Sequence, residues 1–184
     1  MNSLPVRPYC SFLLLATTAV MLLGRHLNAA IVADDDQEKA NAILAETGVQ
    51  GGIVVHLGCG DGKLTAALRA GDSLQVHGLA SEWKNVQAAR EHVRSVGLYG
   101  PVSVDKLSNP KQLPYIDNLI NLVIVEDAGQ IPAKEITRVL VPGGVAYVNN
   151  NGTWQKSVKP WPKNIDDWTH FMHSATNNAV AHDD

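Results

Sequence analysis

The sequence has 184 residues, of which 45% are hydrophobic and 18% are charged. These proportions are enough for one packed domain of ordinary size and argue against a wholly disordered chain. The formal net charge is −3, so no strongly basic balance points to a nucleic acid partner.

The first thirty residues have the pattern of a secretory signal peptide. Arg7 precedes an apolar run over residues 11–24, and the small residues Ala29 and Ala30 follow that run. The run is shorter than the roughly 20 apolar residues of a membrane-spanning helix. We therefore predict that residues 1–30 engage the membrane during export and are then cleaved, which leaves a periplasmic or extracellular protein. An uncleaved N-terminal anchor is the alternative.

Helix and strand patterns alternate over residues 34–149, which we interpret as one domain. Helix starts and ends are indicated by residues such as Ser81, a good N-cap, and Gly97, which favours the end of a helix. Trp83 and three smaller apolar residues after it fall at helical spacing and predict a buried face. The elements expected first are a helix over 37–47, a strand over 53–57, a helix over 63–70, a strand over 74–79 and a helix over 82–96.

The second half of the domain continues with short strands, a proline-bearing loop and one helix. Pro132 occupies a position that is typical of the first turn of a helix, and residues 142–144 (Pro-Gly-Gly) indicate a turn. The expected elements are a strand over 102–104, a loop over 108–115, a strand over 119–125, a helix over 133–140 and a strand over 145–148.

This alternation predicts parallel strands joined by right-handed crossovers. The expected fold class is α/β, with a Rossmann-like, doubly wound and mostly parallel sheet. No helix or strand periodicity is evident after Asn149, so we interpret residues 150–184 as an irregular tail. The sheet is therefore expected to be incomplete at its C-terminal end.

A glycine-rich stretch, residues 51–62 (GGIVVHLGCGDG), lies at the centre of this pattern. It runs from a strand through a loop into a helix, the layout that brings a ligand close to backbone N–H groups. Cys59 lies within the loop and would be the only cysteine left after signal cleavage, so it cannot form an internal disulfide. We interpret it as a small residue that fills a tight loop rather than as a nucleophile.

Residues 51–148 resemble the class I S-adenosylmethionine-dependent methyltransferases. The matches are residues 54–62 to the family's first motif, 76–82 to its second strand, 113–115 to its Leu-Pro-Phe loop and 136–148 to its late Pro-Gly-Gly signature. The resemblance implies a site for S-adenosyl-L-methionine. The residues that it places at this site are His56, Gly58, Cys59, Gly60, Gly62, Ala80, Ser81, Asn109, Leu113 and Glu126.

By this resemblance, Asn109 would bond the adenine amino group, Leu113 would lie beside the adenine and Glu126 would lie on the acceptor side. His56 replaces the family's carboxylate near the amino end of the cofactor. Ala80 replaces the carboxylate that binds both ribose hydroxyls, and a lost hydrogen bond to a charged group costs about 1.5–3 kcal/mol. Glu82 could substitute for it, although an acidic residue in a first helical turn is the more favoured interpretation.

The resemblance implies methyl transfer to an acceptor that the sequence does not identify, and no catalytic residue is assigned. Because His56 and Ala80 depart from the family pattern, enzymatic activity is left open. The alternative is a non-catalytic Rossmann scaffold or interaction module with an unknown protein partner.

The tail also resembles a known segment. Residues 166–170 and 177–183 resemble the junction that precedes the pyrroloquinoline-quinone-type β-propeller of certain exported bacterial proteins, which carry a methyltransferase-like domain before the propeller. This resemblance implies that the chain is a fragment of such a protein. The histidines and aspartates of the tail match no metal-site spacing, and we expect no metal.

Overall fold

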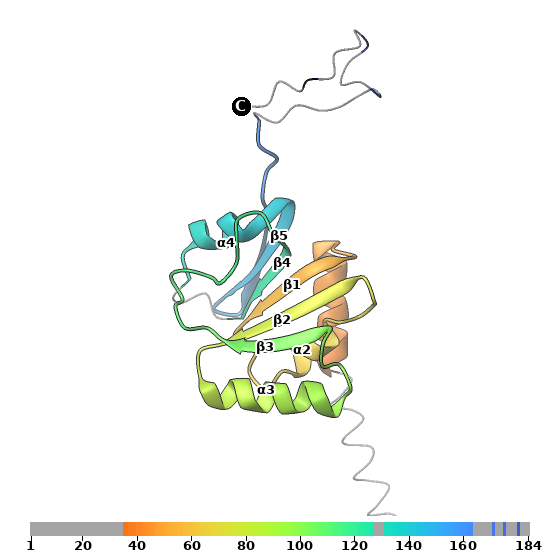
Figure 1. The fold of residues 1–184 in the computed structure, drawn as a ribbon, viewed down its shortest axis with the longest axis vertical. Coiled ribbons are helices and arrows are strands. Elements are labelled where there is room, and N and C mark those ends of the chain that lie inside the picture. The colour runs from red at the N-terminus through yellow and green to blue at the C-terminus, as the bar shows by residue number, and fades with distance from the viewer. Residues whose placement is uncertain (1–34, 127–130, 164–170, 172–174, 176–179, 181–184) are drawn as a thin grey trace, which may run out of the picture.

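A computed structural model describes residues 35–126 and 131–163, together with the single residues 171, 175 and 180, and shows a twisted sheet flanked by helices (Figure 1). The elements are a helix over 35–47, β1 (Gly52–Leu57), α2 (Lys63–Ala67), β2 (Leu74–Ala80), α3 (Trp83–Ser95), β3 (Val102–Lys106), β4 (Ile120–Val125), α4 (Ala133–Val139), β5 (Leu140–Asn150) and β6 (Thr153–Val158).

The described part of the chain forms one six-stranded sheet in the order β3-β2-β1-β4-β5-β6. Strands β1 to β5 pair in parallel, and β6 pairs with β5 in the antiparallel direction. The chain reverses its direction of winding between β1 and β4. The predicted α/β, doubly wound and mostly parallel fold is therefore confirmed, and in such sheets ligands bind outside the carboxyl ends of the strands at this reversal.

Two hydrophobic cores lie on opposite faces of the sheet. Alternate residues of β1 belong to different cores, because neighbouring side chains of a strand point to opposite faces: Val54 lies in the first core and Val55 in the second. The first core is covered by the N-terminal helix, α2 and α3. The second is covered by α4 and by the loop before β4. Covering both faces explains why the central strands are almost continuously apolar.

The start of α3 differs from its prediction. We expected Ser81 as the N-cap, and the N-cap is Glu82, whose side chain makes no capping hydrogen bond. Val86 and the apolar residues that follow it on this face are buried as expected, but Trp83 is 50% exposed. The guanidinium of Arg90 lies over the Trp83 ring, 5.6 Å from its centroid, so this aromatic side chain finds a cationic partner at the surface.

The C-terminal end of the sheet also differs. The predicted turn at 142–144 is instead an irregularity within the continuous strand β5, opposite residues 120–122 of β4. A Cβ on Gly144 would lie 2.8 Å from the carbonyl oxygen of Val141, so the bend requires glycine.

The region that we expected to be irregular from residue 150 contains the end of β5 and the whole of strand β6. Asn151 and Gly152 have φ of 51° and 90°, as a tight two-residue hairpin turn requires. Trp154 of β6 stacks on Tyr147 of β5 with ring centroids 4.8 Å apart. The sheet therefore continues past the predicted domain end at 149.

The predicted export segment, residues 1–30, lies outside the described residues, and so do residues 166–170 of the tail. Cleavage, anchoring and the propeller junction stay predictions. Within the described ranges, no helix combines the length and apolarity needed to span a membrane.

Gly62 offers a test of how α2 packs on α3. It is the N-cap of α2 with φ of 84°, and a Cβ at this position would lie 2.7 Å from the Cα of Ala89. We expect Gly62→Ala to lower the free energy of unfolding by about 1–3 kcal/mol more than Gly97→Ala. Gly97 has a similar φ of 74° with nothing within 4 Å of its Cβ position, so it controls for backbone strain. Equal losses in urea unfolding would contradict the close helix contact.

Candidate functional site

The glycine loop between β1 and α2 is fixed to the end of β2. The backbone N–H groups of Gly58 and Cys59 both donate to the carbonyl oxygen of Leu79, at 2.9 and 3.3 Å. The N–H of Gly62 donates to the carbonyl of Cys59 at 2.8 Å. These three amides are therefore engaged within the protein, and a ligand would have to approach elsewhere along the loop.

A cleft of about 320 Å³ lies outside the carboxyl ends of β1 and β2. Four residues of the predicted site, Gly58, Gly60, Ala80 and Ser81, line it. Its other lining residues, which the sequence-based site omitted, are Leu57, Glu82, Asn85, Leu107, Pro110 and Ile131. The glycine loop, the end of β2, the start of α3 and the segment after β3 thus line the same cleft.

Gly60 differs from Gly62 in what surrounds it. A Cβ on Gly60 would find nothing nearer than the carbonyl oxygen of Gly58 at 4.0 Å, whereas a Cβ on Gly62 would collide with α3. Packing therefore explains glycine at position 62. At position 60, φ is +50° and the space beside the residue belongs to the cleft, as expected of a glycine that allows a ligand close to the backbone.

His56 lies beneath the loop and is 1% exposed. Its Nδ1 is 2.8 Å from Oγ1 of Thr65, and its Nε2 has no hydrogen-bond partner in the described part of the chain. Among the described residues, the nearest carboxylate oxygen to Nε2 is Oε1 of Glu126, 3.9 Å away, which is too long for a hydrogen bond. The same oxygen lies 2.6 Å from Nζ of Lys39 on the N-terminal helix.

Burial keeps the His56 ring neutral. Desolvation lowers the pKa of His56 to about 4, with Glu126 acting in the opposite direction and Lys39 in the same one. The residue therefore supplies no positive or negative charge near neutral pH. Its Nε2 is buried and unpaired within the described residues.

Cys59 is buried within the same loop, and burial raises the pKa of its thiol to about 11. Its Sγ lies 3.2 Å from the position that a Cβ on Gly78 would take. A thiol that stays protonated and fills a narrow space agrees with our interpretation of Cys59 as a packing residue.

Six predicted residues do not line the cleft: His56, Cys59, Gly62, Asn109, Leu113 and Glu126. Gly62 packs against α3, Leu113 is buried in the second core, and Oδ1 of Asn109 accepts the backbone N–H of Lys111 at 3.0 Å. Direct cofactor contacts by these residues stay predictions. Glu82 also lines the cleft, two positions after Ala80. From the sequence, Glu82 could substitute for the carboxylate missing at Ala80.

Comparison with known proteins assigns the family. Residues 55–148, just over half of the chain, match the model of a family described as a methyltransferase domain. The chain therefore belongs to the methyltransferase domain family.

Individual relatives agree with this assignment. Methyltransferase GfsG of Streptomyces halstedii is 35% identical over 98 residues, which are 50% of this chain and 34% of that protein. The chain thus spans about a third of the length of this curated relative.

Solved structures share the fold. A SAM-dependent methyltransferase from Aquifex aeolicus has a TM-score of 0.52 and 23% identity over 59% of this chain and 62% of that one. Phosphoethanolamine N-methyltransferase 2 of Haemonchus contortus, in complex with S-adenosyl-L-methionine, has a TM-score of 0.53 and 22% identity over 60% and 27%. At these identities the likeness establishes the fold alone.

The buried imidazole predicts a pH dependence of stability. The pKa of His56 is about 6.5 in the unfolded chain and about 4 in the folded one. As the pH falls from 6.5 toward about 4, His56 is therefore protonated in the unfolded chain but stays neutral in the folded chain. Stability from this residue is complete above pH 6.5 and falls by about 1.4 kcal/mol per pH unit within that window.

The matched variant is His56→Asn, whose amide can still bond Thr65. Urea unfolding at several pH values should show a smaller loss for the variant between pH 6.5 and about 4. Parallel curves for the two proteins would show that His56 does not titrate differently on folding.

Proposed function

We propose that this chain binds S-adenosyl-L-methionine in the cleft at the ends of β1 and β2 and transfers its methyl group to an acceptor. The observation that carries the proposal is Gly60, a glycine with a left-handed backbone whose missing side chain leaves space in a cleft of a methyltransferase-domain protein. When bound, the cofactor supplies an electrophilic methyl group on a sulfonium. The residues of the chain bind it, orient it and keep water away.

Glu82 is the best candidate for binding the ribose hydroxyls. Ala80 has no polar side chain, but Glu82 lines the same cleft. Its backbone is extended, with φ of −93° and ψ of 128°, and its carboxylate caps no helix amide. The side chain is therefore free to accept hydrogen bonds from a ligand, which favours the substitution for Ala80 that the sequence left as the less favoured interpretation.

Glu126 and His56 can serve the amino-acid end of the cofactor. Glu126 provides a carboxylate for an ammonium group, and the unpartnered Nε2 of His56 lies beside it. Lys39 holds Glu126 through an ion pair between partly exposed side chains, and such pairs are worth about 1 kcal/mol or less. A zwitterionic ligand can therefore compete for Glu126, and Lys39 can then pair with the ligand's carboxylate.

A cofactor-free scaffold is the second candidate. It is favoured by Ala80, a buried methyl group where the resemblance leads us to expect a carboxylate, and by the Lys39–Glu126 pair. This alternative predicts no binding of S-adenosylhomocysteine or S-adenosyl-L-methionine even at millimolar concentration in calorimetry, which would contradict our proposal. Export and attachment to a propeller remain expectations of the sequence alone.

Substitution of Gly60 tests the cleft directly. Gly60→Ala places a methyl group in the space beside the loop, and we expect it to weaken S-adenosylhomocysteine binding roughly tenfold to a hundredfold, as overpacking costs about 1–3 kcal/mol. Gly97→Ala introduces the same left-handed strain at the end of α3, where its Cβ position is open. It should leave affinity unchanged in calorimetry. If both variants bind like the wild type, the ligand does not approach Gly60.

A carboxylate exchange tests the ribose contact. Glu82→Gln should weaken S-adenosylhomocysteine binding by roughly tenfold or more, because a hydrogen bond to a charged group contributes about 1.5–3 kcal/mol. Ala80→Asp should tighten binding and should compensate for Glu82→Gln when the two are combined. Glu91→Gln, which removes an exposed carboxylate later on α3, is the matched control. Unchanged affinity in Glu82→Gln would exclude this residue as the ribose acceptor.

A further inference from the structure

One imidazole outside the cleft contacts both ends of the segment that forms a cleft wall. His77 of β2 has its Nδ1 2.7 Å from the hydroxyl of Tyr115 and its Nε2 3.3 Å from Oδ2 of Asp105. We refer to these two contacts as the His77 bridge. Asp105 lies in β3, and Tyr115 lies in the loop that precedes β4.

The chemistry of the two partners fixes the proton on His77. The Asp105 carboxylate can only accept, so Nε2 carries the hydrogen and Nδ1 is the acceptor. The Tyr115 hydroxyl therefore donates to Nδ1. The two rings meet edge to face, with an interplanar angle of 87°. Desolvation lowers the pKa of His77 against the opposing effect of Asp105, which agrees with a neutral ring at neutral pH.

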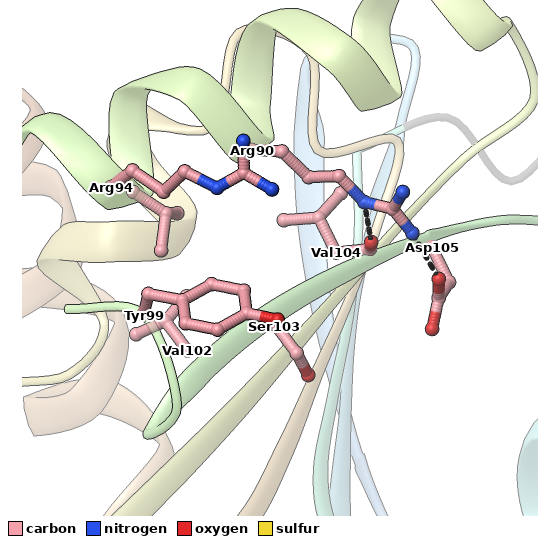
Figure 2. A pocket seen from close by; sticks show the side chains of 8 residues that line it. Arg90, Arg94, Tyr99, Val102, Ser103, Val104 and Asp105 are labelled. Atoms are coloured by element: carbon pink, nitrogen blue, oxygen red, sulfur yellow. Dashed lines mark hydrogen bonds and ion pairs between the residues drawn. The ribbon is translucent and has the colours of Figure 1, made fainter.

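Asp105 is itself held from the outer side of the sheet. Figure 2 shows Arg90 of α3 reaching over the edge strand, where its guanidinium pairs with Asp105 and its Nε donates to the carbonyl oxygen of Val104 at 2.7 Å. Arg90 thus covers an outward carbonyl of β3, the edge strand of the described sheet. The first end of the bridged segment cannot move without breaking these contacts.

The second end is held by α4. Nη1 of Arg138 donates to the carbonyl of Tyr115 at 2.9 Å, and the backbone N–H of Leu113 donates to Oε1 of Glu135 at 2.7 Å. Arg138 and Glu135 also pair with each other at 2.6 Å. The loop around Leu113 is therefore fixed on one side by α4 and on the other by the imidazole of β2.

Between these two ends lie Leu107 and Pro110, which line the cleft. We propose that His77 is a positioning residue, which closes residues 105–115 against β2 and thereby sets the cleft wall formed by Leu107 and Pro110. The inference rests on the proposed function for the identity of the ligand in the cleft. His77 does not line the cleft, so its effect on a ligand is exerted through this segment.

The physical reason is that the middle of the segment makes few fixed contacts. The hydrogen bonds of residues 108–112 are local to the segment, as in the turn at Asn109, whereas Leu107 bonds to Ala80 and Leu113 is buried and bonded to α4. A loop of about ten residues whose ends are released samples many conformations, and local opening of this kind precedes global unfolding. Fixing both ends on one rigid ring keeps the wall in one position.

The first test removes one atom. Tyr115→Phe keeps the ring contact and deletes the hydroxyl donor. We expect S-adenosylhomocysteine to bind the full chain roughly threefold to tenfold more weakly, the fold-change that corresponds to one neutral hydrogen bond. In the unliganded protein, the amides of Leu107 and Leu113 should exchange faster with solvent deuterium.

A matched control separates positioning from general stability. Ser73→Ala deletes a comparable hydroxyl bond, from Oγ to the carbonyl of Gln50 at 2.6 Å, next to the amino end of β2. It should leave both the affinity and the exchange of Leu107 and Leu113 unchanged. An equal loss of affinity in both variants would show that Tyr115 acts only through overall stability and would overturn the proposal.

Conservative replacements of His77 provide a rescue test. Asn presents an amide oxygen that can take the place of Nδ1, whereas Leu has a similar size and no acceptor. His77→Asn should therefore retain more affinity than His77→Leu when both are compared at a temperature at which each is folded. Equal affinities in these two variants would contradict a role for the bond to Tyr115.

The outcomes also distinguish the two proposals. If the wild type does not bind S-adenosylhomocysteine, the proposed function fails, and amide exchange in the unliganded chain still tests the bridge. Unchanged exchange in Tyr115→Phe would overturn the bridge whatever the affinity. Faster exchange with unchanged affinity would show a released loop that does not position the ligand, which also overturns the inference.

Discussion

The carbonyl oxygen of Leu79 is the acceptor on which the candidate site depends. It receives the amides of both Gly58 and Cys59, so the glycine loop cannot lift away from the end of β2. The same constraint sets the start of α2, and Gly62 then brings that helix into direct contact with Ala89 of α3. The cleft is therefore the space left by backbone contacts among three elements, and its shape follows from the sheet more than from side chains at its rim.

The charges near this cleft differ from those that the resemblance to the methyltransferase family implies. The position beneath the loop holds a neutral, buried imidazole instead of a carboxylate, and the end of β2 holds a methyl group. Negative charge is instead found at Glu82, the N-cap of α3 in the cleft lining, and at Glu126, which follows β4 and does not line the cleft. Our proposal therefore assigns the cofactor to acids that lie two residues after Ala80 and directly after β4, and not to positions 56 and 80.

The fold could be predicted from the sequence because the apolar pattern of the strands agrees with the residues that end the helices. Val54 and Val55 lie in opposite cores, as a continuous apolar strand requires, and Gly97 ends α3 where it was expected to. Strand β6 was missed because five of its six residues are exposed and it buries no alternating face; its stability comes from pairing with β5 and from the Tyr147–Trp154 stack. Such interactions between neighbouring strands cannot be predicted from the sequence of one strand alone.

The candidate site was predictable only where the backbone itself forms it. Gly58, Ala80 and Ser81 line the cleft because each lies at or directly after a strand end, and Gly60 lines it from the loop after β1; both positions can be inferred from spacing. Leu107 and Pro110 belong to the segment between Asp105 and Tyr115, whose side chains both contact His77 in the folded sheet. The sequence signals for this segment were Asn109 and the loop at 113–115, which the resemblance placed near the adenine. The contacts of His77 could not be predicted, because they depend on which residues of the neighbouring strand and loop lie beside it in the folded sheet.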